Sequence, residues 1–245
     1  AAADVYKRQR LTKPTSSGRP YEVLVVVDDQ LWQRPAGRAL FDVLDTDVPG
    51  LPQPERSFRI SQTTQKRFSQ VLNIFRTIIK VDIDPTQYTQ TKMKFTCDVY
   101  ARPQVVLTIQ SPNEKDFAAF VKKNSRSIID FLVKVEMNRQ INELEEKHSE
   151  AVSQLAEEIF KCQLWAPAEI KSYKKGKDFF WASSNTASGL VNICMYSYPY
   201  EGPRTFNKQY VLAKRDSVMK ANIPGTEPRM YMATDTPVSY THLRA

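Results

Sequence analysis

The chain is poor in the residues that most catalytic and metal sites require. It holds two histidines and three cysteines in 245 residues. A zinc site or a histidine-based triad needs several such side chains together, whereas His148 lies in a charged helical stretch that no motif joins to a cysteine. The G-x-S-x-G, Walker and G-x-G-x-x-G motifs are also absent. The sequence therefore predicts no catalytic residue, metal or cofactor, and it leans away from an enzyme.

Cysteine pairs and long apolar runs are equally scarce. Cys97, Cys162 and Cys194 are scattered and odd in number, which favours free thiols, although one pair can form. No run approaches the roughly 18 apolar residues that a membrane-spanning helix needs. A small disulfide-stapled fold is thereby excluded, and cysteine usage leaves the compartment open.

What is present is the composition of a globular protein. Hydrophobic residues make up 41% of the chain and charged residues 25%, and this length suits one large domain or two small ones. The net charge is +8, spread along the chain rather than gathered in blocks. We expect only weak, salt-sensitive attraction to anionic partners.

The two ends differ from the rest of the chain. Residues 1–9 and 238–245 look like translated adapter sequence at the edges of a metagenomic gene fragment, and neither continues the periodicity of its neighbours. We treat residues 1–17 as leader and linker and residues 238–245 as a tail, both outside the fold. Ordinary tails are the alternative, and we expect the natural protein to extend further at both ends.

A strand-rich region comes first. Residues 21–28 form a continuous β-branched run, as expected of a strand buried on both faces. The pattern predicts further strands at residues 58–64, 74–83, 92–100 and 104–109, and short helices at residues 36–45 and 65–73.

A long helical stretch follows. No glycine occurs between Gly50 and Gly176, and no proline between Asn113 and Ala166. This predicts two helices, or one long bent helix, with Asn113 as the N-cap. We expect its apolar stripe to pack on the sheet, and a coiled-coil partner is the alternative.

A second, smaller unit completes the pattern. Strands are predicted at residues 169–173, 178–183 and 190–197, with turns at 174–177 and 184–189, and then an amphipathic helix at 206–222. The whole is an α+β fold. We place its N-terminal domain at residues 18–163 and its three-stranded unit at residues 164–237. We expect the three-stranded unit to be incomplete.

Six segments occur in an order that resembles a known family. They are Gly18–Val26 with Trp32, Pro49–Gln53, Asp98–Val106, Gly176–Trp181, Tyr196–Tyr200, and Arg215–Met219 leading to Asn222–Gly225. Together they resemble an uncharacterised bacterial lipoprotein family, domain of unknown function 4837, over residues 18–235.

That resemblance implies export, a lipid anchor at a cysteine before the first strand, and no known activity. The chain departs from the pattern at both ends, because Arg10–Pro14 stands where the lipid-bearing cysteine is expected and the family's C-terminal part is missing beyond Thr236. Localisation in the cell envelope, facing the periplasm, is thus an expectation from the resemblance.

Two candidate surfaces carry charge. Asp28 and Asp29 end a buried strand, where open α/β sheets place ligands, although a solvated strand end is the simpler interpretation. Lys174, Lys175 and Lys177 run into Trp181, a combination that can bind an acidic glycan or single-stranded nucleic acid. The alternative is a lysine-rich turn before a strand whose aromatics fill the core.

The third surface is aromatic. Tyr196, Tyr198 and Tyr200 follow a strand next to prolines, and clustered tyrosines often mark recognition surfaces. The alternative for at least one of them is packing inside the fold.

Three functions remain open. The leading hypothesis is a non-catalytic cell-envelope lipoprotein that binds an envelope protein or a glycan. The alternatives are an enzyme whose site a missing C-terminal segment completes, and an intracellular binder of anionic polymers. Nucleic acid is disfavoured as a partner, and the sequence does not indicate an oligomeric state.

Overall fold

The computed structural model divides the chain into two compact units. It describes residues 13–51, 53–69, 71–186, 189–227 and 230–234. Unit 1 comprises residues 1–139 and unit 2 residues 140–245. Each unit contains both helices and a sheet, which confirms the predicted α+β class.

Unit 1 is built on a five-stranded sheet. Its strands are β1 (Glu22–Val26), β2 (Arg59–Thr63), β3 (Thr77–Ile83), β4 (Lys92–Cys97) and β5 (Val105–Ser111). The order is β2-β1-β3-β5-β4, with parallel pairing throughout except for β4, which runs antiparallel at one edge. Residues 23–27 are buried, so the prediction of a central strand covered on both faces is confirmed.

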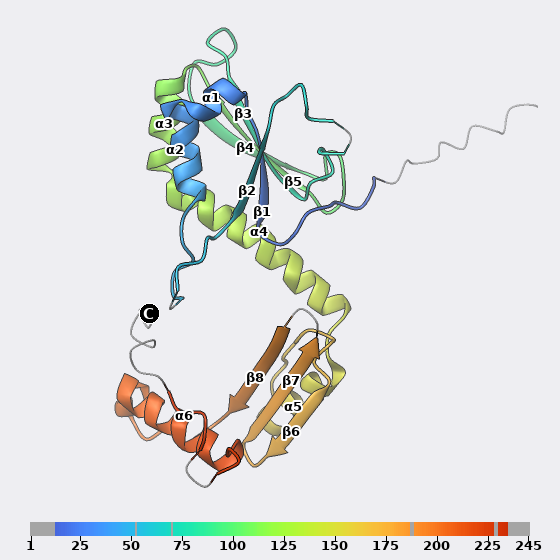
Figure 1. The fold of residues 1–245 in the computed structure, drawn as a ribbon, viewed down its shortest axis with the longest axis vertical. Helices are drawn as coiled ribbons and strands as arrows, with labels where there is room; N and C mark the ends of the chain where they lie inside the picture. Colours follow the sequence, from blue (N-terminus) through green and yellow to red (C-terminus); the bar gives the residue numbers. More distant parts are fainter. Residues whose placement is uncertain (1–12, 52, 70, 187–188, 228–229, 235–245) are drawn as a thin grey trace, which may run out of the picture. The chain divides into compact units, whose positions relative to one another are not determined.

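Helices cover one face of this sheet and loops the other (Figure 1). The helices are α1 (Asp29–Gln33), α2 (Pro35–Leu44), α3 (Glu114–Lys123) and α4 (Ser125–Glu146). The helical face forms the main core, in which Leu40, Ile79, Phe117 and Ile128 are fully buried. The predicted helical stretch is divided at Asn124 and again at residues 147–149, so it forms three helices rather than the two, or the one long helix, that we expected. Asn113 caps α3 as predicted, since its Oδ1 accepts a hydrogen bond from the amide of Asp116 at 2.8 Å.

The predicted helix over residues 65–73 is wrong. The described residues of this segment form turns, and the amides of Arg67 and Phe68 donate to the carbonyl of Thr64. Phe68, together with Phe75, packs on the face of the sheet that carries no helix, against Val26, Ile78 and Val106. The apolar residues of this segment are therefore buried by a loop that packs on the sheet, and these tertiary contacts override the helical spacing of the sequence.

A buried ionic cluster joins α4 to the start of β3. Glu136 and Arg139 are only 3% and 7% exposed. The Glu136 carboxylate lies 3.1 Å from the Arg139 guanidinium and 2.8 Å from that of Arg76. Arg139 also donates to the hydroxyl of Thr77 at 2.8 Å. Burial lowers the pKa of Arg139, and the neighbouring Glu136 carboxylate opposes that shift.

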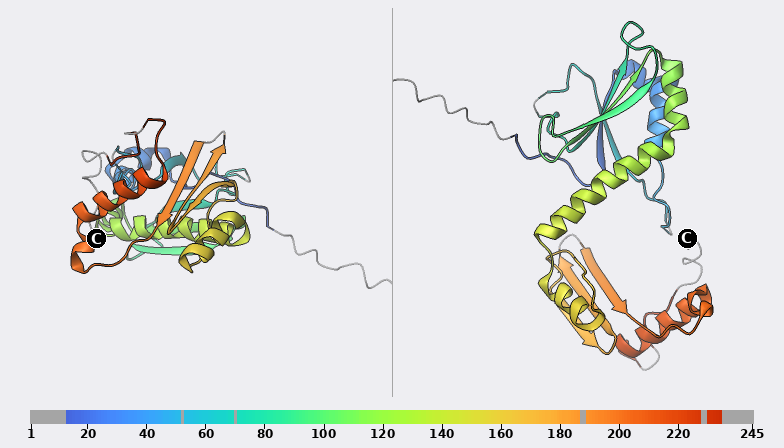
Figure 2. Two further views of the ribbon diagram at one scale, coloured as in Figure 1. Left: turned by 90° about the horizontal axis from the view of Figure 1, so that it is seen from below. Right: turned by 180° about the vertical axis from the view of Figure 1, so that it is seen from behind.

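Unit 2 is a three-stranded antiparallel sheet with helices. Its elements are α5 (Glu150–Phe160), β6 (Ser172–Gly176), β7 (Phe179–Thr186), β8 (Gly189–Tyr196), the short 3₁₀ helix η1 (Pro203–Phe206) and α6 (Lys208–Asn222). The order is β6-β7-β8. Helix α5 packs across one face, seen from behind in Figure 2, and buries Val152, Leu155 and Phe180.

The predicted turn at residues 174–177 is also wrong. Lys174 and Lys175 pair with Trp181 and Phe180 inside the β6–β7 hairpin. The reversal falls instead at Lys177 and Asp178, where Asp178 adopts a left-handed backbone with φ of 51°. Aspartate tolerates this conformation better than most residues, and it permits a tight turn.

Candidate binding face on the three-stranded sheet

One face of the small sheet is left uncovered by α5, and α6 approaches it at the end where Phe179 pairs with Tyr196 and is only 1% exposed. Directly paired residues of antiparallel strands lie on the same face, and the register pairs Lys174 with Trp181 and Trp181 with Cys194. Asn192 and Tyr196 share this face by the alternation of β8. Helix α5 packs on the opposite face of the sheet, and it lies behind the three strands in Figure 1. We call this surface the helix-free face.

Trp181 forms the centre of the helix-free face. Its side chain is partly exposed, and its indole Nε1 donates to Oδ1 of Asn192 at 2.9 Å. The bond fixes the orientation of both side chains and leaves the amide NH₂ of the exposed Asn192 available as a donor. A flat apolar ring beside an oriented amide can contact both the apolar face and the hydroxyl groups of one ligand.

A tyrosine cluster continues the surface. The rings of Tyr196 and Tyr198 stack at 6.3 Å, and Tyr198 meets Tyr210 of α6 at 6.0 Å. The Lys214 ammonium lies 5.7 Å from the centroids of both Tyr198 and Tyr210. Burial raises the pKa of Tyr196 and of Tyr210, so both phenols stay protonated at neutral pH, and the Tyr210 hydroxyl donates to the Glu201 carboxylate at 3.1 Å.

Tyr200 lies apart from this cluster. It is 64% exposed and contacts Phe206, which is 78% exposed, with ring centroids 5.6 Å apart. The structure therefore brings Tyr196 and Tyr198 together, and it places Tyr200 in a separate aromatic pair. Phe206, Tyr210 and Lys214 were not among the predicted site residues, because they follow the tyrosine segment in sequence and reach its neighbourhood only through the fold.

The three candidate lysines separate in the structure. Lys174 lies on the helix-free face, where its Nζ donates to the carbonyl of Asn222 at 2.5 Å, a favourable place for a cation at the end of α6. Lys175 points to the other face and pairs with Glu158 of α5. Lys177 is exposed in the turn. Of the three, only Lys174 is placed beside Trp181.

Cys194 lies between Trp181 and Tyr196 on the helix-free face, but its thiol is weakly reactive. Burial raises the pKa of its thiol, so the neutral thiol dominates at physiological pH and is a poor nucleophile. All three cysteines are free in the structure. The helix-free face is therefore suited to contact rather than to covalent chemistry.

The acidic pair in unit 1 has a local partner. Asp29 accepts hydrogen bonds from Gln62 at 3.0 Å and from Arg67 at 2.6 Å, while Asp28 is exposed ahead of α1. Among the residues that the structure describes, no group of three or more His, Cys, Asp or Glu could hold a metal ion. Asp29 is thus engaged in an ion pair at the carboxyl end of β1.

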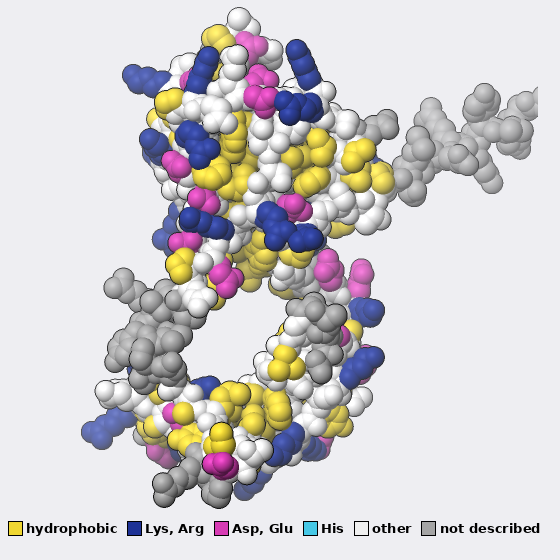
Figure 3. Space-filling model, viewed as in Figure 1, with side chains coloured by type: hydrophobic (Ala, Val, Ile, Leu, Met, Phe, Trp, Pro, Cys, Tyr) yellow, Lys and Arg dark blue, Asp and Glu magenta, His cyan; other side chains and the backbone are white. Residues whose placement is uncertain are grey.

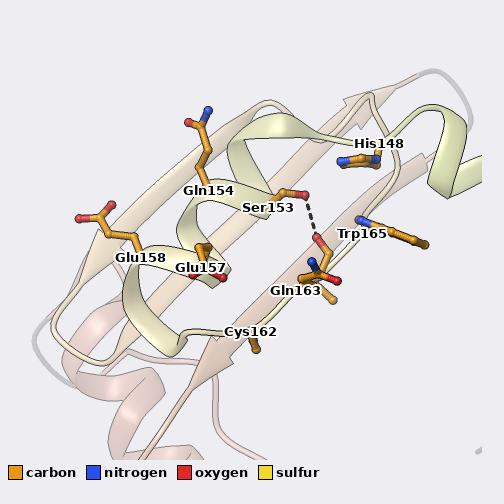
Figure 4. A pocket seen from close by; sticks show the side chains of 9 residues that line it. His148, Ser153, Gln154, Glu157, Glu158, Cys162, Gln163 and Trp165 are labelled. Carbon is orange, nitrogen blue, oxygen red and sulfur yellow. Dashed lines mark hydrogen bonds between the residues drawn. The ribbon is translucent and has the colours of Figure 1, made fainter.

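Sequence reasoning missed a hollow beside α5. It measures about 560 Å³ and is open to solvent. Figure 4 shows His148 and Trp165 next to each other toward one end, with ring centroids 5.8 Å apart, and Cys162 at the other. Gln154 and Glu158 point outward from α5 (Figure 4). No sequence motif joins these residues, since their contact depends on how the chain turns back after α5.

The comparisons with known proteins agree with the two-unit architecture. No described helix is long and apolar enough to cross a membrane. No curated protein and no solved structure matches the chain. The model of a family described as Domain of unknown function (DUF4837) matches residues 149–245, which confirms the predicted resemblance for that part. The model of another, Domain of unknown function (DUF8532), matches residues 16–145, more than half of the chain, and the protein therefore belongs to the DUF8532 family with a DUF4837 match after it.

Proposed function

We propose that the protein is a non-catalytic binding protein of the cell envelope, and that unit 2 binds an anionic glycan through its helix-free face. The observation that carries the proposal is the pair of partly exposed aromatic side chains, Trp181 and Tyr196, on a sheet face that α5 leaves uncovered, together with Tyr198, which stacks on Tyr196 just beyond the end of β8. Rigid aromatic side chains provide contact area at little entropic cost.

The chemistry of the neighbours favours an acidic sugar polymer. Aromatic rings can stack on the C–H-bearing face of a pyranose, while the Asn192 amide can bind hydroxyl groups. Lys174 and Lys214 flank the rings and supply positive charge for carboxylate or phosphate groups. In Figure 3 hydrophobic side chains gather over the small sheet, with Lys and Arg side chains beside them.

Substitution of one central ring tests the proposal. We expect Trp181→Ala to weaken binding of an acidic glycan at least about tenfold, the loss typical of a buried aromatic contact. The matched control is Tyr173→Ala, which removes an aromatic side chain that is 57% exposed on the opposite face of the same sheet. Calorimetric titration against acidic and neutral polysaccharides, with single-stranded DNA in parallel, gives the affinities. Equal affinity of Trp181→Ala and wild type, or a preference for DNA, would contradict the proposal.

The envelope location rests on the family resemblance and needs its own test. The intact gene product, expressed in a related host, should appear in the membrane fraction and incorporate a fatty-acid analogue. Unlabelled protein in the cytoplasm would refute the envelope assignment while leaving the glycan titration to be judged separately.

A further inference from the structure

In the part of the chain that the structure describes, the two sheets have four edge strands, and these strands differ in whether charged residues protect them from pairing with another chain. An edge strand exposes a row of unpaired N–H and C=O groups that another chain can pair with, and natural proteins block such pairing with charged residues, lysine above all. The edges here are β2 and β4 in unit 1 and β6 and β8 in unit 2.

Three of these edges carry basic residues and the fourth does not. Arg59 lies on β2, Lys92 and Lys94 lie on β4, and Lys174 and Lys175 lie on β6. In contrast, β8 reads Gly-Leu-Val-Asn-Ile-Cys-Met-Tyr, with no charged residue and no proline. The usual protection is therefore missing from β8.

The unprotected edge is long and apolar. All eight residues of β8 pair with β7, and in the described part of the chain no strand pairs with its other side. Leu190 is 66% exposed and Val191 is 44% exposed. A regular, uncharged strand with exposed aliphatic side chains is suited to accept a further strand.

We propose that β8 pairs antiparallel with β8 of a second copy of this chain, which gives a six-stranded sheet of order β6-β7-β8-β8-β7-β6. Antiparallel self-pairing places the residues at the middle of a strand next to their own copies at the two-fold axis, where like charges would be repulsive. Lys94 of β4 and Lys174 of β6 lie near the middle of their strands, whereas the middle of β8 carries the uncharged Asn192 and Ile193. The exposed Leu190 and Val191 would lie beside half-buried apolar residues from the opposite end of the partner strand.

The pairing has a geometric consequence for the helix-free face. The two-fold axis between antiparallel strands stands perpendicular to the sheet, so the helix-free faces of both copies lie on the same side. Trp181 and the tyrosine cluster are then present twice on one continuous surface, which suits a ligand built of repeating units. The dimer itself does not depend on glycan binding, so each proposal can fail without the other.

A lysine placed on either edge of the small sheet tests the dimer. Val191→Lys restores the protective charge on β8, and Tyr173→Lys is the matched control, since both side chains are partly exposed on the same face of the sheet. In sedimentation measurements over a concentration series, we expect wild type and Tyr173→Lys to form dimers equally well. The dimer dissociation constant of Val191→Lys should rise about tenfold or more, because each lysine would lie against apolar residues of the partner strand and lose hydration there. A monomeric wild type, or equal dimerisation of all three proteins, would overturn the proposal.

Amide hydrogen exchange shows whether the loss is specific to the edge. In the wild-type dimer, β8 amides that point away from β7 should be protected at high protein concentration and exchange in Val191→Lys. The amides that bond β7 to β8 should stay protected in both proteins, which shows that the variant is folded. Protection of the outward amides that appears only when a different envelope protein is added would refute self-pairing in favour of strand addition by that partner.

Discussion

At the scale of single residues, the least expected feature is the charge inside unit 1. Glu136 lies on a helix face that also buries Ile128 and Leu132, and its single carboxylate pairs with the guanidinium groups of both Arg76 and Arg139. Removing one partner of a buried ionic cluster leaves charge in a poorly solvated place, which costs more than the cluster itself contributes.

Substitution of Glu136 measures that cost. We expect Glu136→Gln, which preserves shape and removes the charge, to lower the free energy of unfolding of unit 1 by about 3–5 kcal/mol. Asp130→Asn, at an exposed position of α4 within unit 1, should change it by no more than about 0.5 kcal/mol. Urea unfolding followed by circular dichroism compares the two, and equal stability of both variants would show that the cluster is not energetically coupled to the fold.

The residue scale also explains why the lysine surface was grouped incorrectly from the sequence. Lys174 and Lys175 are adjacent in the chain, but alternation along β6 sends them to opposite faces. The sequence interpretation placed them in a turn, where no such alternation applies. Because β6 extends to Gly176, Lys174 and Lys175 lie within the strand, and only Lys174 shares a face with Trp181.

At the scale of elements, helices and strands with strong periodicity were predictable and covering segments were not. The β1 run and the α2 stripe can be recognised in the sequence, because each buries a continuous set of apolar side chains. Helix α6 buries only Met219, and its end is marked instead by the Ile223-Pro-Gly225 sequence. The segment around Phe68 has a similar spacing, yet it forms turns across the sheet. Likewise, Tyr210 and Lys214 join Tyr198 through packing of α6, for which no local signal exists.

The contact between α1 and α2 gives a prediction at this scale. In most helices, replacing glycine by alanine stabilises by about 1 kcal/mol. At Gly37 the added Cβ would lie 2.3 Å from the Leu31 carbonyl oxygen and 2.5 Å from Cα of Trp32, both backbone atoms. We therefore expect Gly37→Ala to destabilise unit 1 in thermal unfolding.

The comparison for Gly37 is an exposed position on the same helix. Asp42→Ala should change stability by no more than about 0.5 kcal/mol. A Gly37→Ala protein that melts at or above the wild-type temperature would mean that α2 can move away from α1 at no cost, contrary to the close packing described above.

At the scale of the whole molecule, the account assigns binding to unit 2 and to one face of it. The three tryptophans can report where a ligand binds, since each lies in a different part of the structure. Trp32 is buried in the core of unit 1, Trp165 borders the hollow beside α5, and Trp181 lies on the helix-free face.

The most direct measurement is therefore a nitrogen–proton correlation spectrum of the three indole N–H groups during titration with an acidic glycan, assigned with single Trp→Phe variants. The account predicts that the Trp181 signal shifts with saturation, because ligand contact disturbs its hydrogen bond to Asn192, while the Trp32 signal stays in place. A saturable shift of the Trp165 signal alone would move the binding site to the hollow beside His148, and no shift of any indole signal would contradict glycan binding by this chain.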